Sequence, residues 1–171
     1  MPRTILHLDL DAFFCAVEEL NDPSLRGKAF AVGGRPDQRG VVASCSYAAR
    51  AFGVHSAMPM GQALRTCPGL LIVSHSHGNY SGYSRQVMER LDNISPLVEQ
   101  ISIDEAFVDI SDIQEPAQDI ASRLQKQILD EIGLPCSIGV ASNKLMAKIA
   151  TECGKKAKKS RPFQAGFDEY D

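Results

Sequence analysis

The chain has 171 residues, 44% of them hydrophobic, and a formal net charge of −3. This length suits one domain, or one domain with an inserted lobe, and the apolar fraction is sufficient for a core. No apolar run is long enough to span a membrane, and the N-terminus lacks a signal peptide's apolar stretch, so we expect a cytoplasmic protein without a membrane partner. Residues 155–171 hold five Lys or Arg, but the rest of the chain is acidic, so we expect the 171-residue chain alone to bind DNA weakly.

The first half of the chain reads as short, mixed elements. Alternating aliphatic residues predict a strand over 4–10, and the apolar spacing that follows predicts a helix over 12–20, which Asn-Asp-Pro-Ser ends. The next segment is interrupted by Gly and Pro. In it we expect strands at 29–32, 41–44 and 70–73 and helical turns at 47–52 and 60–65.

The second half has longer elements. We expect a helix over 80–91, a hairpin of strands 97–103 and 106–110, and a helix that begins at Pro116. A strand over 136–141 follows, and a last helix reaches about Cys153. Five scattered cysteines without a CxxC pair predict free thiols, and the isolated pair His75 and His77 favours a surface loop over a zinc site.

With residues 20–76 set aside, the order is strand, helix, strand, strand, helix, strand. This order predicts an α+β fold of two layers, the ferredoxin-like βαββαβ arrangement, with a small lobe inserted after the first helix. We expect residues 1–19 and 77–155 to form the main domain and residues 20–76 the lobe. Residues 156–171 are expected to be a divergent tail and a candidate for disorder.

Two pairs of carboxylates point to a metal site. Asp104 and Glu105 are adjacent in a strand connection without glycine, although such connections normally carry Gly, Asn or Pro. Adjacent carboxylates repel each other unless a cation offsets them, but a solvated turn explains this pair equally well when it is taken alone. Asp9 and Asp11 end the first strand in the same way. Two strand ends that finish in acids favour a shared site for Mg²⁺ or Mn²⁺.

The predicted fold makes the first strand and the hairpin neighbours, so Asp9 can face Asp104 and Glu105. Three carboxylates there could hold two Mg²⁺ ions about 3.5–4 Å apart, which would activate an attacking oxygen and neutralise a leaving phosphate. The start of the first helix, at residues 12–14, offers main-chain N–H groups to a phosphate.

The inserted lobe adds side chains suited to phosphate. Tyr47 and Arg50 lie three apart, on one face if the segment is helical, and Ser44 lies just before them. Arg suits bidentate phosphate contacts and Tyr a single hydrogen bond. Lys155, expected beyond the last helix, can return to the same place. Each of these residues, taken singly, is more often a surface residue than a ligand.

Four sequence blocks resemble the Y-family of translesion DNA polymerases, and most closely its DinB or DNA polymerase IV branch. They are residues 8–14 (LDLDAFF), 46–54 (SYAARAFGV), 102–111 (SIDEAFVDIS) and 137–150 (SIGVASNKLMAKIA). The resemblance implies that Asp9, Asp104 and Glu105 bind the metal ions, with the main-chain carbonyl of Leu10 as a further ligand. By the same resemblance the ions are two Mg²⁺, for which Mn²⁺ can substitute.

The resemblance also implies a nucleotide site. In it Phe14 is the steric gate against the ribose 2′-OH, whereas the alternative is a core aromatic, a place that Phe13 fits better. The main domain corresponds to the palm and the lobe to the fingers. The residues that would hold the triphosphate of the incoming nucleotide are Ser44, Tyr47, Arg50 and Lys155.

We therefore expect template-directed DNA synthesis, in which a primer 3′-OH attacks the α-phosphate of a dNTP. The expected partners are a DNA primer–template, a dNTP and, through a further C-terminal part, a sliding clamp. The family continues after Lys155 with Lys-Pro-x-Gly and a helical thumb, and this sequence diverges there. Two alternatives stay open: a catalytically idle fragment that binds a nucleotide or a partner, and a nucleotidyl cyclase. A cyclase shares the palm and the paired acids, but it needs no primer and leaves the lobe unexplained.

Overall fold

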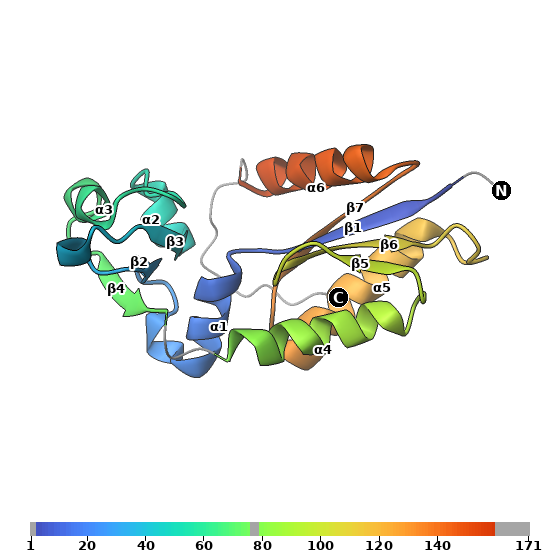
Figure 1. The fold of residues 1–171 in the computed structure, drawn as a ribbon, viewed down its shortest axis with the longest axis horizontal. Coiled ribbons are helices and arrows are strands. Elements are labelled where there is room, and N and C mark those ends of the chain that lie inside the picture. Colours follow the sequence, from blue (N-terminus) through green and yellow to red (C-terminus); the bar gives the residue numbers. More distant parts are fainter. Residues whose placement is uncertain (1–2, 76–78, 160–171) are drawn as a thin grey trace.

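The computed structural model describes residues 3–75 and 79–159, which form two sheets joined by helix α1 (Phe13–Asn21) (Figure 1). The first sheet is four-stranded and antiparallel throughout, in the order β5-β6-β1-β7. Its strands are β1 (Ile5–Leu10), β5 (Val98–Gln100), β6 (Glu105–Asp109) and β7 (Cys136–Ala141). This order confirms the ferredoxin-like arrangement.

Helices cover both faces of the first sheet (Figure 1). Helices α4 (Tyr80–Asp92) and α5 (Ala117–Ile132) lie on one face, and α6 (Lys144–Lys159) lies on the other. The leucines of β1 point to α4 and α5 and form the main core with these helices. Since side chains alternate along a strand, Ile5, His7 and Asp9 point to α6 instead. No helix in the described ranges is long and apolar enough to cross a membrane.

The second sheet is three-stranded, in the order β3-β2-β4, and has a core of its own. Strand β2 pairs antiparallel with β3 and parallel with β4. The elements of this lobe are η1 (Pro23–Leu25), β2 (Phe30–Gly33), η2 (Pro36–Gln38), β3 (Val42–Cys45), α2 (Tyr47–Ala51), α3 (Met60–Thr66) and β4 (Leu71–Ser74). The predicted boundary after residue 76 falls at 76–78, outside the described residues.

Helix α1 has apolar residues on two faces, and each face packs into a different core. Phe13, Ala16 and Val17 belong to the main core, whereas Cys15 packs with Phe30 and other residues of the lobe. Helix α1 therefore packs both against the first sheet's core and against the lobe.

Several predictions about the elements were wrong. Helix α6 does not end at Cys153 but continues to Lys159, because Gly154 stands among strong helix formers and has no left-handed backbone angle. Lys155 therefore lies within α6, and residues 156–159, which were expected to belong to the tail, are helical. Pro116 precedes α5 as its cap instead of beginning it.

The order deduced from the sequence also omitted one helix and misplaced the hairpin turn. Both α1 and α4 lie between β1 and β5, and it is α4 that packs beside α5. The amides of Ile101 and Ser102 bond to the Glu105 carbonyl, at 2.9 and 3.2 Å, so β5 stops early and Glu105 already belongs to β6.

Helix α6 approaches the sheet closely at Gly139 of β7, which lies opposite His7 of β1. A Cβ atom at this position would lie 2.3 Å from the Ala147 carbonyl oxygen and 2.5 Å from the Thr151 amide nitrogen. Both distances are impossible for a real side chain. Glycine is therefore required here by the backbone of α6.

We predict that Gly139→Ala destabilises the chain by about 1–3 kcal/mol, because the added methyl group must push α6 off the sheet. Urea unfolding of the parent and the variant measures this difference. Gly154→Ala is the control, since a Cβ there meets no atom within 4 Å. It should stabilise the helix by about 0.5–1 kcal/mol. Equal midpoints for Gly139→Ala and the parent would contradict the close approach.

Candidate active site

Two strand ends bring the predicted acids together. Asp9 of β1 lies directly opposite Glu105 of β6, and both belong to the face covered by α6. The Leu10 amide donates a hydrogen bond of 2.9 Å to the Asp104 carbonyl oxygen. Leu10 has its side chain in the core, so only its main chain is available to this site. The backbone thus places Asp9, Asp104 and Glu105 side by side, as the sequence predicted.

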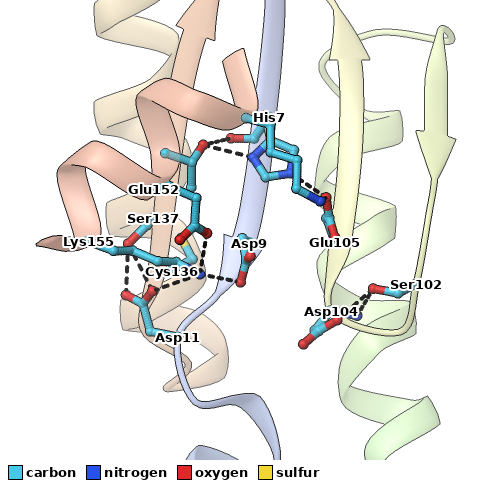
Figure 2. A network of polar contacts seen from close by, with 12 residues as sticks. His7, Asp9, Asp11, Ser102, Asp104, Glu105, Cys136, Ser137, Glu152 and Lys155 are labelled. Atoms are coloured by element: carbon cyan, nitrogen blue, oxygen red, sulfur yellow. Dashed lines mark hydrogen bonds and ion pairs between the residues drawn. The ribbon is translucent and has the colours of Figure 1, made fainter. Parts of the chain in front are cut away.

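The three carboxylates do not converge, however. The Asp104 carboxylate accepts a hydrogen bond of 2.6 Å from the Ser102 hydroxyl at the turn, on the side away from Asp9 (Figure 2). In the part of the chain that the structure describes, no three His, Cys, Asp or Glu side chains are arranged to hold a metal ion. The donors are carboxylate oxygens, which fit a hard cation such as Mg²⁺. Only Oδ1 of Asp104 is bonded to Ser102, so a shared ion would require the three carboxylates to move closer together.

Asp9 is paired with Lys155. The Lys155 ammonium lies 2.7 Å from Asp9 Oδ1 and 3.9 Å from Asp11 Oδ1 (Figure 2). Burial raises the pKa of Asp9, and the negative charges of Asp104 and Glu105 add to this effect, so that together they outweigh Lys155. The charged form of Asp9 is therefore disfavoured in this environment, and a further cation beside it would stabilise that form.

Glu105 has a different environment. His7 Nε2 lies 2.8 Å and Lys148 Nζ lies 2.6 Å from the same oxygen, Oε1. Burial opposes the charged form, but the hydrogen bonds from Lys148 and His7 prevail and hold the pKa of Glu105 below its ordinary value. The environment thus favours the ionised form of Glu105, whereas it disfavours the ionised form of the neighbouring Asp9.

Asp11, which the resemblance does not include among the metal ligands, is held by another residue of the chain. The Ser137 hydroxyl lies 2.8 Å and 3.1 Å from its two carboxylate oxygens, and the side chain is buried. Asp11 therefore connects the end of β1 to β7.

The lobe presents Tyr47 and Arg50 together. The Arg50 guanidinium lies 5.3 Å from the centre of the Tyr47 ring, and its Nε donates to the Cys45 carbonyl at 3.1 Å. Half of the Tyr47 surface is exposed, but its hydroxyl group is shielded from solvent. This shielding and the negative charge of Asp11 raise the pKa of the hydroxyl group. The two residues share one face of α2, as predicted, and Tyr47 lies near enough to the strand-end acids to respond to their charge.

Ser44 has a buried place on β3. It forms a hydrogen bond with the Cys15 thiol, and burial raises the pKa of that thiol to about 12. The Ser44 side chain therefore contacts α1 in this structure, where it links the lobe to the helix after β1.

The two adjacent phenylalanines of α1 have separate environments. Phe13 is fully buried in the main core, whereas Phe14 is only partly buried and packs between the main core and the lobe. The Phe14 ring lies 4.8 Å from the Tyr80 ring, edge to face, and 4.5 Å from the exposed His75 ring. His77, the other half of the H-x-H pair, lies outside the described residues.

Four residues at the site were not predicted from the sequence: His7, Ser102, Lys148 and Thr151. The sequence could have indicated His7, because it lies two residues before Asp9 in a strand and must therefore share a face with it. It could not have indicated Lys148 and Thr151, since their contacts depend on where α6 lies over the sheet.

Comparisons with known proteins identify the family of this chain. Residues 8–152 match the family described as impB/mucB/samB. DNA polymerase IV from Ralstonia nicotianae is 46% identical over 156 residues, which are 90% of this chain and 44% of that protein. DNA polymerase IV from Streptomyces coelicolor is 51% identical over 157 residues, which are 89% of this chain and 33% of that protein. The chain thus spans less than half the length of these relatives.

Solved structures show the same fold. A crystal structure of DinB from Sulfolobus solfataricus matches with a TM-score of 0.80 and 31% identity, over 93% of this chain and 46% of that one. An insertion ternary complex of Dbh DNA polymerase matches with a TM-score of 0.80, 30% identity and the same coverage. Both are Y-family polymerases. The chain belongs to the impB/mucB/samB family, the Y-family to which DNA polymerase IV belongs.

We predict that Asp9→Asn stabilises the chain at pH 7 in the presence of EDTA. An acid whose pKa folding raises is penalised when it ionises, so the penalty is full above the raised pKa and absent below the ordinary value of 3.8. The advantage of Asn should therefore shrink as the pH falls from 7 toward about 4. Urea unfolding across this range measures it, with exposed Asp130→Asn as the control. A less stable Asp9→Asn variant at pH 7 would mean that the Lys155 pair outweighs burial.

Proposed function

We propose that this chain is the catalytic part, palm and fingers, of a translesion DNA polymerase. The observation that carries the proposal is the placement of Asp9 opposite Glu105, with Asp104 hydrogen-bonded to Leu10, in a chain of the Y-family. In the reaction a primer 3′-OH attacks the α-phosphate of a dNTP. A new phosphodiester bond forms, the bond to the β-phosphate breaks, and pyrophosphate leaves.

The residues that would hold two Mg²⁺ ions, or Mn²⁺ in their place, are Asp9, Asp104, Glu105 and the Leu10 carbonyl. Such ions activate the attacking oxygen and offset the charge on the transferring phosphate. Glu105 supports this role because His7 and Lys148 keep it ionised, and Asp104 lies on a turn where its carboxylate can exchange Ser102 for another partner.

The side chains proposed for the triphosphate are cationic or polar. Arg50 and Tyr47 would bind phosphate oxygens from the lobe, and Lys155 would bind them from α6 after it exchanges the Asp9 carboxylate for a phosphate. Ser44 would contribute through the packing of β3 on α1. Phe14, at the junction of the lobe and the main core, would exclude a ribose 2′-OH by contact.

The proposed partners follow from the reaction. They are a DNA primer–template and a dNTP, with a sliding clamp bound through the part of the relatives that this chain does not match. We propose that the protein acts in the cytoplasm. A nucleotidyl cyclase or an idle nucleotide-binding fragment would share the fold, and primer dependence distinguishes both from a polymerase.

We predict that Asp104→Ala and Glu105→Ala each reduce primer extension by at least about 100-fold, because charge stabilisation at the transferring phosphate is lost. The measurement uses a fusion of residues 1–155 to the C-terminal part of the Ralstonia nicotianae DNA polymerase IV that this chain does not match. The parental fusion should extend a primer only when template, dNTP and Mg²⁺ are present.

Glu99→Ala is the matched control, since Glu99 is an exposed carboxylate on the neighbouring strand β5 that pairs with Lys144. This variant should keep near-parental extension. Near-parental extension by Asp104→Ala or Glu105→Ala would refute the metal-site assignment, and a primer-independent product would favour the cyclase.

We predict that Phe14→Val lowers the discrimination between dNTP and rNTP in the same fusion by about 10- to 200-fold, the usual effect of one small steric contact. Incorporation of one nucleotide of each kind opposite the same template base measures the ratio. Phe13→Leu is the control, because Phe13 is a buried core residue whose change should lower stability and leave the ratio unaltered. An unchanged ratio in Phe14→Val would assign Phe14 to the core.

A further inference from the structure

A fully buried histidine lies between the candidate metal ligands and helix α6. The His7 side chain has no exposed surface, and each ring nitrogen has a polar partner. Nδ1 lies 2.8 Å from the Thr151 hydroxyl on α6, and Nε2 lies 2.8 Å from Oε1 of Glu105 on β6 (Figure 2). One ring thus connects β1, β6 and α6.

The direction of the bond to Glu105 follows from the chemistry of its partners. An ionised carboxylate only accepts hydrogen bonds, so Nε2 must be protonated and must donate the hydrogen bond to Glu105. The Thr151 hydroxyl suits either state of Nδ1, because a hydroxyl both donates and accepts. Glu105 therefore receives a hydrogen bond from His7 in both protonation states of the ring.

The surroundings hold the His7 ring in place. The Phe107 ring, opposite it on β6, lies 4.7 Å away, and Gly139, opposite it on β7, allows α6 to come close enough for the Thr151 contact. Lys148, the other donor to Glu105, has a side chain that is 48% exposed. His7 is therefore the rigid donor and Lys148 the adaptable one.

We propose that His7 is a positioning residue for divalent-metal binding. It fixes the Glu105 carboxylate through Oε1, in one orientation on the face of the sheet that carries Asp9, and so presents Oε2 to the ion. The inference rests on the proposed metal site, and it assigns to His7 a role toward that site which packing alone does not require. Partners that orient a ligating carboxylate typically change metal affinity by about 10- to 100-fold.

Two substitutions separate positioning from packing. In His7→Gln the amide nitrogen can take the place of Nε2 and still donate to Glu105, but it loses Thr151. In His7→Asn the shorter side chain can reach Thr151 but not Glu105. Each variant therefore loses one buried hydrogen bond, and a purely structural role predicts similar effects for the two.

The test is a Mn²⁺ titration of the ¹⁵N-labelled 171-residue chain, followed by paramagnetic broadening of the amide signals of Leu10 and Ala106. We expect His7→Asn to bind Mn²⁺ about 10-fold more weakly than the parent and His7→Gln to stay within about threefold of it. Urea unfolding of both variants checks that their stabilities are comparable. Asp9→Asn, which removes a proposed ligand, is the reference for loss of the site.

Each result separates the inference from the metal site itself. If Asp9→Asn abolishes the broadening while His7→Asn binds like the parent, the site stands and the role of His7 is refuted. Equal losses in His7→Asn and His7→Gln would likewise refute positioning in favour of packing. If the parent shows no broadening at Leu10 and Ala106, the metal site is wrong and the inference falls with it.

Discussion

The packing of α6 along β1 is the constraint on which the rest of the structure depends. Two residues of a strand advance by about 6.6 Å and four residues of a helix by about 6 Å, so the two elements stay nearly in step. Every second residue of β1 therefore meets every fourth residue of α6. The contacting pairs are Ile5 with Ala147, His7 with Thr151, and Asp9 with Lys155. Gly139 makes this approach possible, because any side chain there would collide with the helix backbone.

The same packing determines the charge balance of the site. Asp9 and Glu105 lie opposite each other, and α6 supplies one lysine to each, Lys155 and Lys148. Burial and neighbouring negative charge nevertheless raise the pKa of Asp9, while fixed hydrogen bonds lower that of Glu105. The ionised form of Glu105 is favoured and that of Asp9 is disfavoured. Added positive charge therefore stabilises the two ionised carboxylates, which is the property that a metal-dependent phosphoryl transfer uses.

Helix α1 relates the lobe to this site. Its two faces belong to two cores, and Phe14 packs against both, so the ring proposed as the gate lies where the two parts of the chain meet. Cys15 and Ser44 are hydrogen-bonded in the same region, and the buried thiol has its pKa raised to about 12. Packing of α1 thus contributes to where Tyr47 and Arg50 lie relative to the strand-end acids.

The sequence by itself determined the strand-end acids, the order of the strands around them and the alternation that turns Asp9 away from the core. These follow from local patterns, because a strand's period and a turn's composition are written in neighbouring residues. The tertiary structure alone decided three further features. It placed Lys155 on Asp9 from within a helix that was expected to stop earlier, it turned Asp104 toward Ser102, and it positioned Thr151 to hold His7. The contacts of Lys155 and Thr151 depend on how closely α6 packs on a strand distant in the chain, and no local pattern encodes that distance. The Asp104 contact lies within one turn and depends on the orientation of its side chain, which residue identity alone does not specify.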